Sequence, residues 1–151
     1  MINFESVDAA LDFAMEGEQE SYEFYKGLAD KMEKQEMKDI FNSFAAEELG
    51  HKGKLQAVKD GKLMMNSEQK ITDLKIGDYL VDVKPSAEMS YQDALTLAMK
   101  KEKAAYRLYT DLAKTVVDEN LKNTFQALAQ EEAKHKLRFE IAYDDEILTE
   151  N

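Results

Sequence analysis

The chain of 151 residues has no cysteine, one proline, six glycines and two histidines. Without cysteine it cannot form disulfides, zinc-thiolate sites, iron–sulfur clusters or a thiol nucleophile, so any metal must bind to oxygen and nitrogen ligands. Glycine and proline interrupt helices, and their scarcity beside abundant Ala, Leu, Glu, Lys, Met and Gln favours long helices. The composition therefore predicts an all-α fold.

Long apolar runs and an excess of basic residues are also missing. No stretch approaches the roughly 18 apolar residues of a membrane span, and the N-terminus lacks the basic region and apolar core of a signal peptide. We therefore expect a cytoplasmic protein that does not contact membranes. The formal net charge of −11 argues against nucleic acid as a partner.

Hydrophobic residues make up 44% of the chain and charged residues 34%, which suits one buried core. We expect a single domain over residues 1–151. Apolar residues recur with helical spacing over about residues 6–32 and 37–58, and Ser6 suits a helix N-cap. The first part of the chain is therefore predicted to be a helical hairpin over about residues 6–60.

The middle of the chain differs from what flanks it. Asp60-Gly61 suits a helix stop, and residues 61–89 hold the only proline, Pro85, without a strong long period. We interpret this stretch as a connector, with a short helix around Asp73–Val81.

The pattern of the first hairpin returns at Ser90, which again suits an N-cap, with Asp93 at the third helical position as in a capping box. A shift of 84 residues, from Ser6 to Ser90, aligns the two halves without a gap. The chain is therefore predicted to be two repeated hairpins, over about 6–60 and 90–148. Aligned pairs include Leu11 with Leu95, Ala14 with Ala98, Tyr22 with Tyr106, Tyr25 with Tyr109 and Phe41 with Phe125.

The length of the connector indicates how the hairpins are arranged. A helix of about 26 residues is roughly 39 Å long, a distance that a connector of about 30 residues can span. Such a crossover lets the second hairpin start at the opposite end of a four-helix bundle. The middles of all four helices would then meet around a pseudo-twofold axis.

Both histidines of the chain follow a glutamate by three residues, as Glu48 with His51 and Glu132 with His135. Residues three apart on a helix point to one side and can bind one metal or two adjacent ones. One such pair is weak evidence in a chain rich in glutamate. Two pairs at equivalent positions of the repeat predict a shared metal site.

Two further glutamates, Glu18 and Glu102, fall within the inward-facing stripe of the first helix of each hairpin. The alternative interpretation is that they lie at the edge of the stripe and reach solvent. With Glu48 and Glu132 they bring about four negative charges, which two divalent metals would neutralise. Metal binding is therefore predicted to raise the melting temperature. Carboxylates and imidazoles suit iron or manganese, with zinc as a competitor.

The chain combines a helix with one glutamate, a helix with Glu-x-x-His, a long crossover and the same two helices again. This combination resembles the ferritin-like di-iron carboxylate fold, and within it the rubrerythrin family. The resemblance implies two iron ions. It also implies that Glu18 with His51 and Glu102 with His135 are terminal ligands, and that Glu48 and Glu132 bridge the irons. It covers nearly the whole chain, through Ala14–Tyr25, Ala45–His51, Ala98–Tyr109 and Ala129–His135.

The sequence departs from rubrerythrins proper in two ways. Those proteins have a further glutamate one turn after the ligand of the third helix, where this chain has Ala105, matched by Ser21 in the first half. They also carry a four-cysteine rubredoxin domain that delivers electrons. Electrons here would have to come from a separate protein, such as a rubredoxin-like donor, or from substrate iron.

Tyr22 and Tyr106 lie one turn after Glu18 and Glu102. Their hydroxyls are candidates to hydrogen-bond ligand carboxylates or to supply an electron, and a core role is the equal alternative.

Four other neighbours of the motifs have simpler interpretations. We expect Tyr25 and Tyr109 to lie in the core. Glu47 and Glu131 point about 100° away from the glutamates that follow them, which favours solvated or interhelical ion-pair positions.

The leading functional hypothesis is a di-iron oxidoreductase that reacts with peroxide or dioxygen in oxidative-stress defence. The alternatives are iron(II) oxidation and iron handling, as in ferritins, and a bundle in which metal only stabilises the fold. The resemblance also implies a homodimer.

Overall fold

The computed structural model describes residues 3–4, 6–61, 71–75 and 90–150, and it consists mainly of four long helices. The helices are α1 (Val7–Lys31), α2 (Gln35–Lys59), α3 (Tyr91–Thr115) and α4 (Glu119–Glu150), and the two strands are β1 (Asn3–Phe4) and β2 (Ile71–Lys75). The predicted all-α fold is confirmed.

Three helix ends form where the sequence places stop and start signals. The Ser6 hydroxyl accepts a hydrogen bond from the Ala9 amide at 3.1 Å, and Ser90 accepts one from the Asp93 amide at the same distance. Each bond satisfies an amide that has no partner within its own helix. Gly61 ends the first hairpin with a φ of +83°, a backbone angle that favours glycine.

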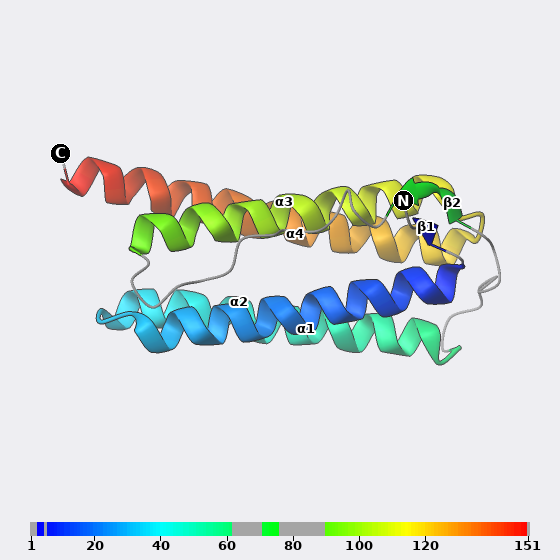
Figure 1. Ribbon diagram of the computed structural model, residues 1–151, viewed down its shortest axis with the longest axis horizontal. Helices are drawn as coiled ribbons and strands as arrows, with labels where there is room; N and C mark the ends of the chain where they lie inside the picture. Colours follow the sequence, from blue (N-terminus) through cyan, green and yellow to red (C-terminus); the bar gives the residue numbers. More distant parts are fainter. Residues whose placement is uncertain (1–2, 5, 62–70, 76–89, 151) are drawn as a thin grey trace.

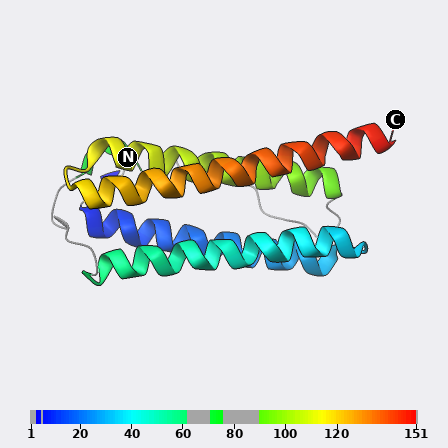
Figure 2. The same ribbon diagram turned by 180° about the vertical axis from the view of Figure 1, so that it is seen from behind.

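The two hairpins run in opposite senses along one bundle (Figures 1 and 2). α1 begins at the end of the bundle that carries β1 and β2, whereas α3 begins at the other end. α1 therefore lies antiparallel to α2 within its hairpin and antiparallel to α3 across the bundle. This is the arrangement that the repeat and the long crossover predict.

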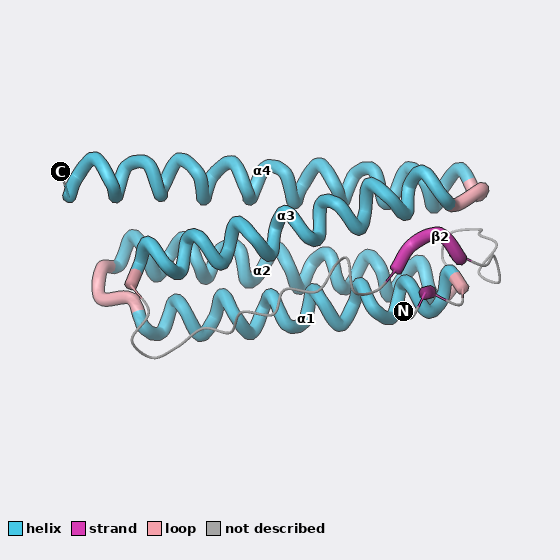
Figure 3. Tube along the Cα trace, turned by 45° about the horizontal axis from the view of Figure 1, so that its top comes forward, coloured by secondary structure: helices cyan, strands magenta, loops and turns pink. Residues whose placement is uncertain are grey.

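A small antiparallel sheet was not predicted. β1 pairs with β2, with Asn3 opposite Lys75 and Phe4 opposite Ile71 (Figure 3). The predicted short helix around Asp73–Val81 is wrong over its first three residues, which belong to β2, and residues 76–81 lie outside the described residues. A two-stranded pairing joins segments far apart in the chain, so local sequence patterns do not reveal it.

Apolar side chains form two clusters, one toward each end of the bundle, with the predicted site residues between them. The first cluster includes Leu11, Ala14, Leu55, Leu112, Phe125 and Leu128, and the second includes Phe24, Leu28, Phe41, Phe44, Leu95 and Phe139. Burial of these side chains stabilises the fold and keeps water away from both sides of the middle layer. Among the described helices, none is apolar over a stretch long enough to cross a membrane.

Candidate metal centre

All six predicted ligands meet in the middle layer of the bundle. Their exposed fractions range from 0% for Glu132 to 8% for His51, although glutamate is almost never fully buried without a partner. Each helix supplies at least one of them. Glu18 comes from α1, Glu48 and His51 from α2, Glu102 from α3, and Glu132 and His135 from α4.

The six side chains form two overlapping groups, in each of which the candidate ligand atoms lie within 4.8 Å of one another. Glu48 and Glu132 belong to both groups, which places them between the other four side chains. The first group adds Glu18 and His51, and the second adds Glu102 and His135. This partition corresponds to the one that the family resemblance implies, with two equivalent halves around two shared carboxylates.

His51 points its Nδ1 atom into the first group. The atom lies 2.8 Å from Glu132 Oε1, 3.6 Å from Glu18 Oε1 and 3.8 Å from Glu48 Oε1. The Glu132 contact has the separation of a hydrogen bond, and it links α2 to α4. One imidazole nitrogen therefore faces three carboxylates from three different helices.

His135 occupies the equivalent place in the second group. Its Nδ1 atom lies 3.1 Å from Glu48 Oε1 and 3.5 Å from Glu102 Oε1, while its Nε2 atom lies 3.0 Å from Glu47 Oε2. The carboxylate of Glu47 thus stands on the far side of the ring. A carboxylate in this place favours the tautomer whose other nitrogen is free to bind metal.

Among the described residues, the contact between Glu47 and His135 has no counterpart in the other half. The equivalent Glu131 lies 3.5 Å from the exposed Lys134, as expected of a surface ion pair. Glu47 reaches from α2 to α4 instead, so its interhelical contact is with a candidate ligand. The two halves of the site therefore differ on their outer sides.

Two tyrosines tie the hairpins together across the site. Tyr25 on α1 donates a hydrogen bond to Glu102 on α3, and Tyr109 on α3 donates one to Glu18 on α1, each at 2.5 Å. Both tyrosines are buried, as predicted. Their hydrogen bonds to the glutamates were not predicted. Burial and then the charge of the neighbouring glutamate raise the pKa of each hydroxyl, so both remain donors at neutral pH.

Tyr22 and Tyr106 were candidates for hydrogen bonds to ligand carboxylates or for electron supply, with a core role as the equal alternative. Tyr106 is 41% exposed, Tyr22 packs half-buried against the second apolar cluster, and within the described part of the chain neither donates to a ligand carboxylate. Tyr25 lies two turns rather than one turn beyond Glu18, which returns it to nearly the same face of the helix. This two-turn spacing, from Glu18 to Tyr25 and from Glu102 to Tyr109, was the sequence signal that could have identified the two hydrogen-bonding tyrosines.

Burial and mutual repulsion change how the carboxyl groups ionise. Burial and then the charges of neighbouring glutamates raise the pKa of Glu48 and of Glu132 well above the ordinary value. Burial also acts to raise the pKa of Glu18, but hydrogen bonds with His51 and Glu48 outweigh it and lower that pKa. Without a cation to balance them, the shared carboxyl groups therefore bind protons more tightly than an exposed glutamate does, while Glu18 loses its proton more readily.

Several buried ligand atoms have no hydrogen-bond partner within the described part of the chain, and they provide a direct test of whether a metal pair fits. They are Glu18 Oε2, Glu48 Oε1, Glu102 Oε2, Glu132 Oε2 and both ring nitrogens of His135. A buried polar atom without a partner is costly, and native structures contain few of them. Two divalent cations would satisfy the carboxylate oxygens and the inward-facing Nδ1 of His135, and they would offset the charge of four carboxylates, so the residues fit a di-metal centre.

A four-helix bundle in which two carboxylate–histidine groups share two glutamates defines the class of ferritin-like di-iron carboxylate proteins. The model of the rubrerythrin family matches residues 9–143. The chain belongs to the rubrerythrin family.

Solved structures support the fold. A candidate ferritin-like diiron-carboxylate protein from Thermotoga maritima superposes with a TM-score of 0.81 at 18% identity, covering 97% of this chain and 99% of that one. A hypothetical protein from Pyrococcus furiosus gives a TM-score of 0.71 at 28% identity, covering 92% of this chain and 89% of that one. No curated protein matches the chain.

Proposed function

We propose that this protein is a di-iron oxidoreductase that reacts with peroxide or dioxygen and protects the cell against oxidative stress. The observation that carries the proposal is the pair of overlapping ligand groups. All six side chains are buried, and five of them have ligand atoms without a hydrogen-bond partner among the described residues. Carboxylate and imidazole ligands suit iron, and manganese or zinc would compete for the same atoms. Bound iron supplies the electrons for reduction of the oxidant.

The position of each side chain in the site sets the role that we propose for it. Glu18 with His51 would hold one iron and Glu102 with His135 the other, while Glu48 and Glu132 would bind both. Tyr25 and Tyr109 hold the terminal carboxylates in place through hydrogen bonds from the opposite hairpin. The two apolar clusters exclude water on either side, which strengthens electrostatic interactions within the layer.

Stopped-flow spectroscopy on anaerobic protein loaded with iron(II) tests the proposal. Mixing with hydrogen peroxide, and separately with dioxygen, should oxidise about two irons per chain in a fast phase. Protein loaded with zinc is the matched control and should show no optical change. Absence of oxidation by either oxidant would leave only a structural role for the metal.

Iron handling is the second candidate, and the acidic surface favours it. The net charge of −11 and the exposed Glu16 and Glu20 beside Glu18 would attract iron(II) toward the site. This function predicts oxidation of many irons per chain without an added electron donor. Oxidation that stops near two irons per chain supports the first function instead.

The catalytic cycle needs a source of electrons and a defined assembly. We propose a separate rubredoxin-like protein as the donor, because the chain has no cysteine to hold a cluster of its own. We also propose a cytoplasmic homodimer. Sedimentation of the iron-loaded protein separates a dimer from the hollow shell that iron storage requires.

A further inference from the structure

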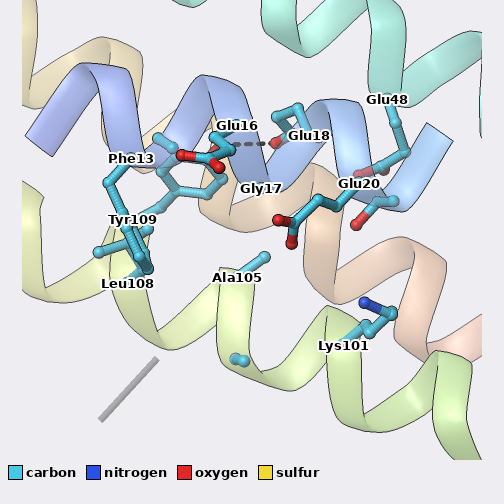
Figure 4. A pocket seen from close by; sticks show the side chains of 13 residues that line it. Phe13, Glu16, Gly17, Glu18, Glu20, Glu48, Lys101, Ala105, Leu108 and Tyr109 are labelled. Atoms are coloured by element: carbon cyan, nitrogen blue, oxygen red, sulfur yellow. Dashed lines mark hydrogen bonds between the residues drawn. The ribbon is translucent and has the colours of Figure 1, made fainter. Parts of the chain in front are cut away.

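A cavity of about 320 Å³ opens between α1 and α3 and reaches the first ligand group (Figure 4). Glu18 and Glu48 stand at its inner end. Phe13, Ala105 and Leu108 give it apolar walls, whereas Glu102 and His135 are not among the lining residues. The cavity therefore reaches Glu18 of the first group and the shared Glu48, but neither of the residues that belong to the second group alone.

The internal repeat shows how the two halves differ at this cavity. Gly17 lines it, and the equivalent position in the second half is Lys101, 84 residues later. The Lys101 side chain lies over the ring of Phe24, with Nζ 5.1 Å from the ring centroid, and Phe24 is the equivalent of Leu108. The aliphatic part of Lys101 therefore covers the second half of the site, at the position where Gly17 leaves the first half open.

Gly17 has no packing requirement of its own. A Cβ atom built on it would meet no other atom within 4 Å. Glycine in a helix interior costs about 1 kcal/mol relative to alanine, so α1 gives up stability at this position. In exchange, the glycine leaves open space in the wall of the cavity.

The cavity is much larger than hydrogen peroxide requires. A water molecule takes up about 30 Å³ in the liquid, so the volume equals that of roughly ten waters, whereas hydrogen peroxide has the bulk of about two. Ligand sites of this size that combine apolar walls with a few polar groups bind organic molecules. The size and the walls therefore fit an organic substrate.

The charges around the cavity narrow the class of that substrate. Among its lining residues, the exposed carboxylates of Glu16 and Glu20 outnumber the single ammonium group of Lys101, and Glu18 adds a further negative charge at the inner end. An organic anion would be repelled on balance. A neutral molecule with an apolar group is therefore favoured over an anionic one.

We propose that this cavity binds the organic group of a neutral alkyl or aryl hydroperoxide and directs its O–O bond toward Glu18 and Glu48. This proposal rests on the proposed di-iron function and names its substrate class. In the reaction the O–O bond breaks, and the hydroperoxide takes up two electrons and two protons to give an alcohol and one water. Two iron(II) ions are oxidised to iron(III) as the source of the electrons.

Binding of the product alcohol tests the cavity without any reaction. The probe is 2-phenyl-2-propanol, titrated by NMR into the full chain loaded with redox-inert zinc. Gly17→Met introduces a side chain that is about as long as lysine but uncharged. This variant should bind the alcohol at least tenfold more weakly than the wild type does. Gly27→Met is the control. Gly27 is another glycine of α1, lies outside the cavity and has no described atom within 4 Å of a built Cβ. This variant should bind the alcohol as the wild type does.

Failure of the wild type to bind the alcohol would overturn the proposal. Equal binding by Gly17→Met, or equal loss in Gly27→Met, would overturn it as well. Circular dichroism and metal content of both variants confirm that each is folded and loaded.

Reaction rates distinguish failure of the cavity from failure of the proposed function. With iron(II)-loaded protein, Gly17→Met should lower the rate with cumene hydroperoxide at least tenfold relative to its rate with hydrogen peroxide. An unchanged ratio would contradict the cavity assignment alone. If neither oxidant reacts with the wild type, the proposed function fails, and the alcohol titration still reports on the cavity.

Discussion

Glu48 and Glu132 experience the strongest repulsion of the carboxyl groups in the middle layer, because each is shared by both ligand groups. Both are essentially excluded from solvent, and neighbouring glutamates raise the pKa of each beyond the effect of burial. These two side chains connect the halves of the site. Their replacement should therefore affect both metal positions.

We expect Glu48→Ala and Glu132→Ala each to bind fewer than two metals per chain, because each change removes a ligand from both groups. Metal analysis of gel-filtered protein after loading with iron(II) measures the loss. Glu36→Ala, at an exposed glutamate in the first turn of α2, is the control and should load fully. Full loading of both site variants would refute the assignment.

The tyrosine bonds make a second residue-scale prediction. Tyr25→Phe and Tyr109→Phe each leave a buried carboxylate oxygen without its donor, which should destabilise the metal-free protein by about 1–3 kcal/mol. Urea unfolding measures the change. Tyr22→Phe should lie within about 0.5 kcal/mol of the wild type, because Tyr22 donates no comparable bond within the described structure. Equal effects of all three changes would contradict the hydrogen bonds.

At the scale of the helices, glycines on exposed faces lower helix stability without a packing benefit. Gly53 lies in the interior of α2, is exposed, and has no atom within 4 Å of a built Cβ. Gly53→Ala should therefore raise the free energy of unfolding by about 0.5–1 kcal/mol. Gly61→Ala is the contrasting change and should destabilise the protein, since its φ of +83° strains any residue with a Cβ. Urea unfolding of both variants decides whether the two glycines differ in this way.

The helix scale also separates what could be predicted from what could not. The lengths and ends of α1 and α3 follow from apolar spacing and the N-caps Ser6 and Ser90, which act locally. The pairing of β1 with β2 depends on contact between segments about 70 residues apart, and no local pattern encodes it.

For the whole molecule, the metal-free state should lose stability as pH rises. The pKa values of Glu48 and Glu132 are raised above the ordinary 4.5, so both bind protons more tightly in the folded than in the unfolded chain. Their contribution to stability is present below about pH 4.5 and is lost as pH rises through the raised values. The lowered pKa of Glu18 affects stability mainly at pH values below the ordinary pKa of a glutamate, outside this window.

We therefore expect the melting temperature of chelated protein to fall between about pH 5 and pH 8, where exposed carboxylates are already ionised. Glu48→Gln should flatten this dependence, because it removes one of the two groups. Metal loading should raise the melting temperature strongly at pH 8, where the charge it offsets is largest. Scanning calorimetry of chelated and iron-loaded samples measures both effects, and equal stability of the two samples would rule out a metal-stabilised layer.

The sequence by itself determined the four helices, the repeat and the six side chains of the middle layer. These features follow from spacing along a helix and from a shift of 84 residues, both of which are properties of the chain alone. Only the tertiary structure decided which tyrosines reach the carboxylates, that Glu47 stands behind His135, and that Gly17 leaves a cavity on one side. Those contacts join different helices, and their geometry depends on how the hairpins pack.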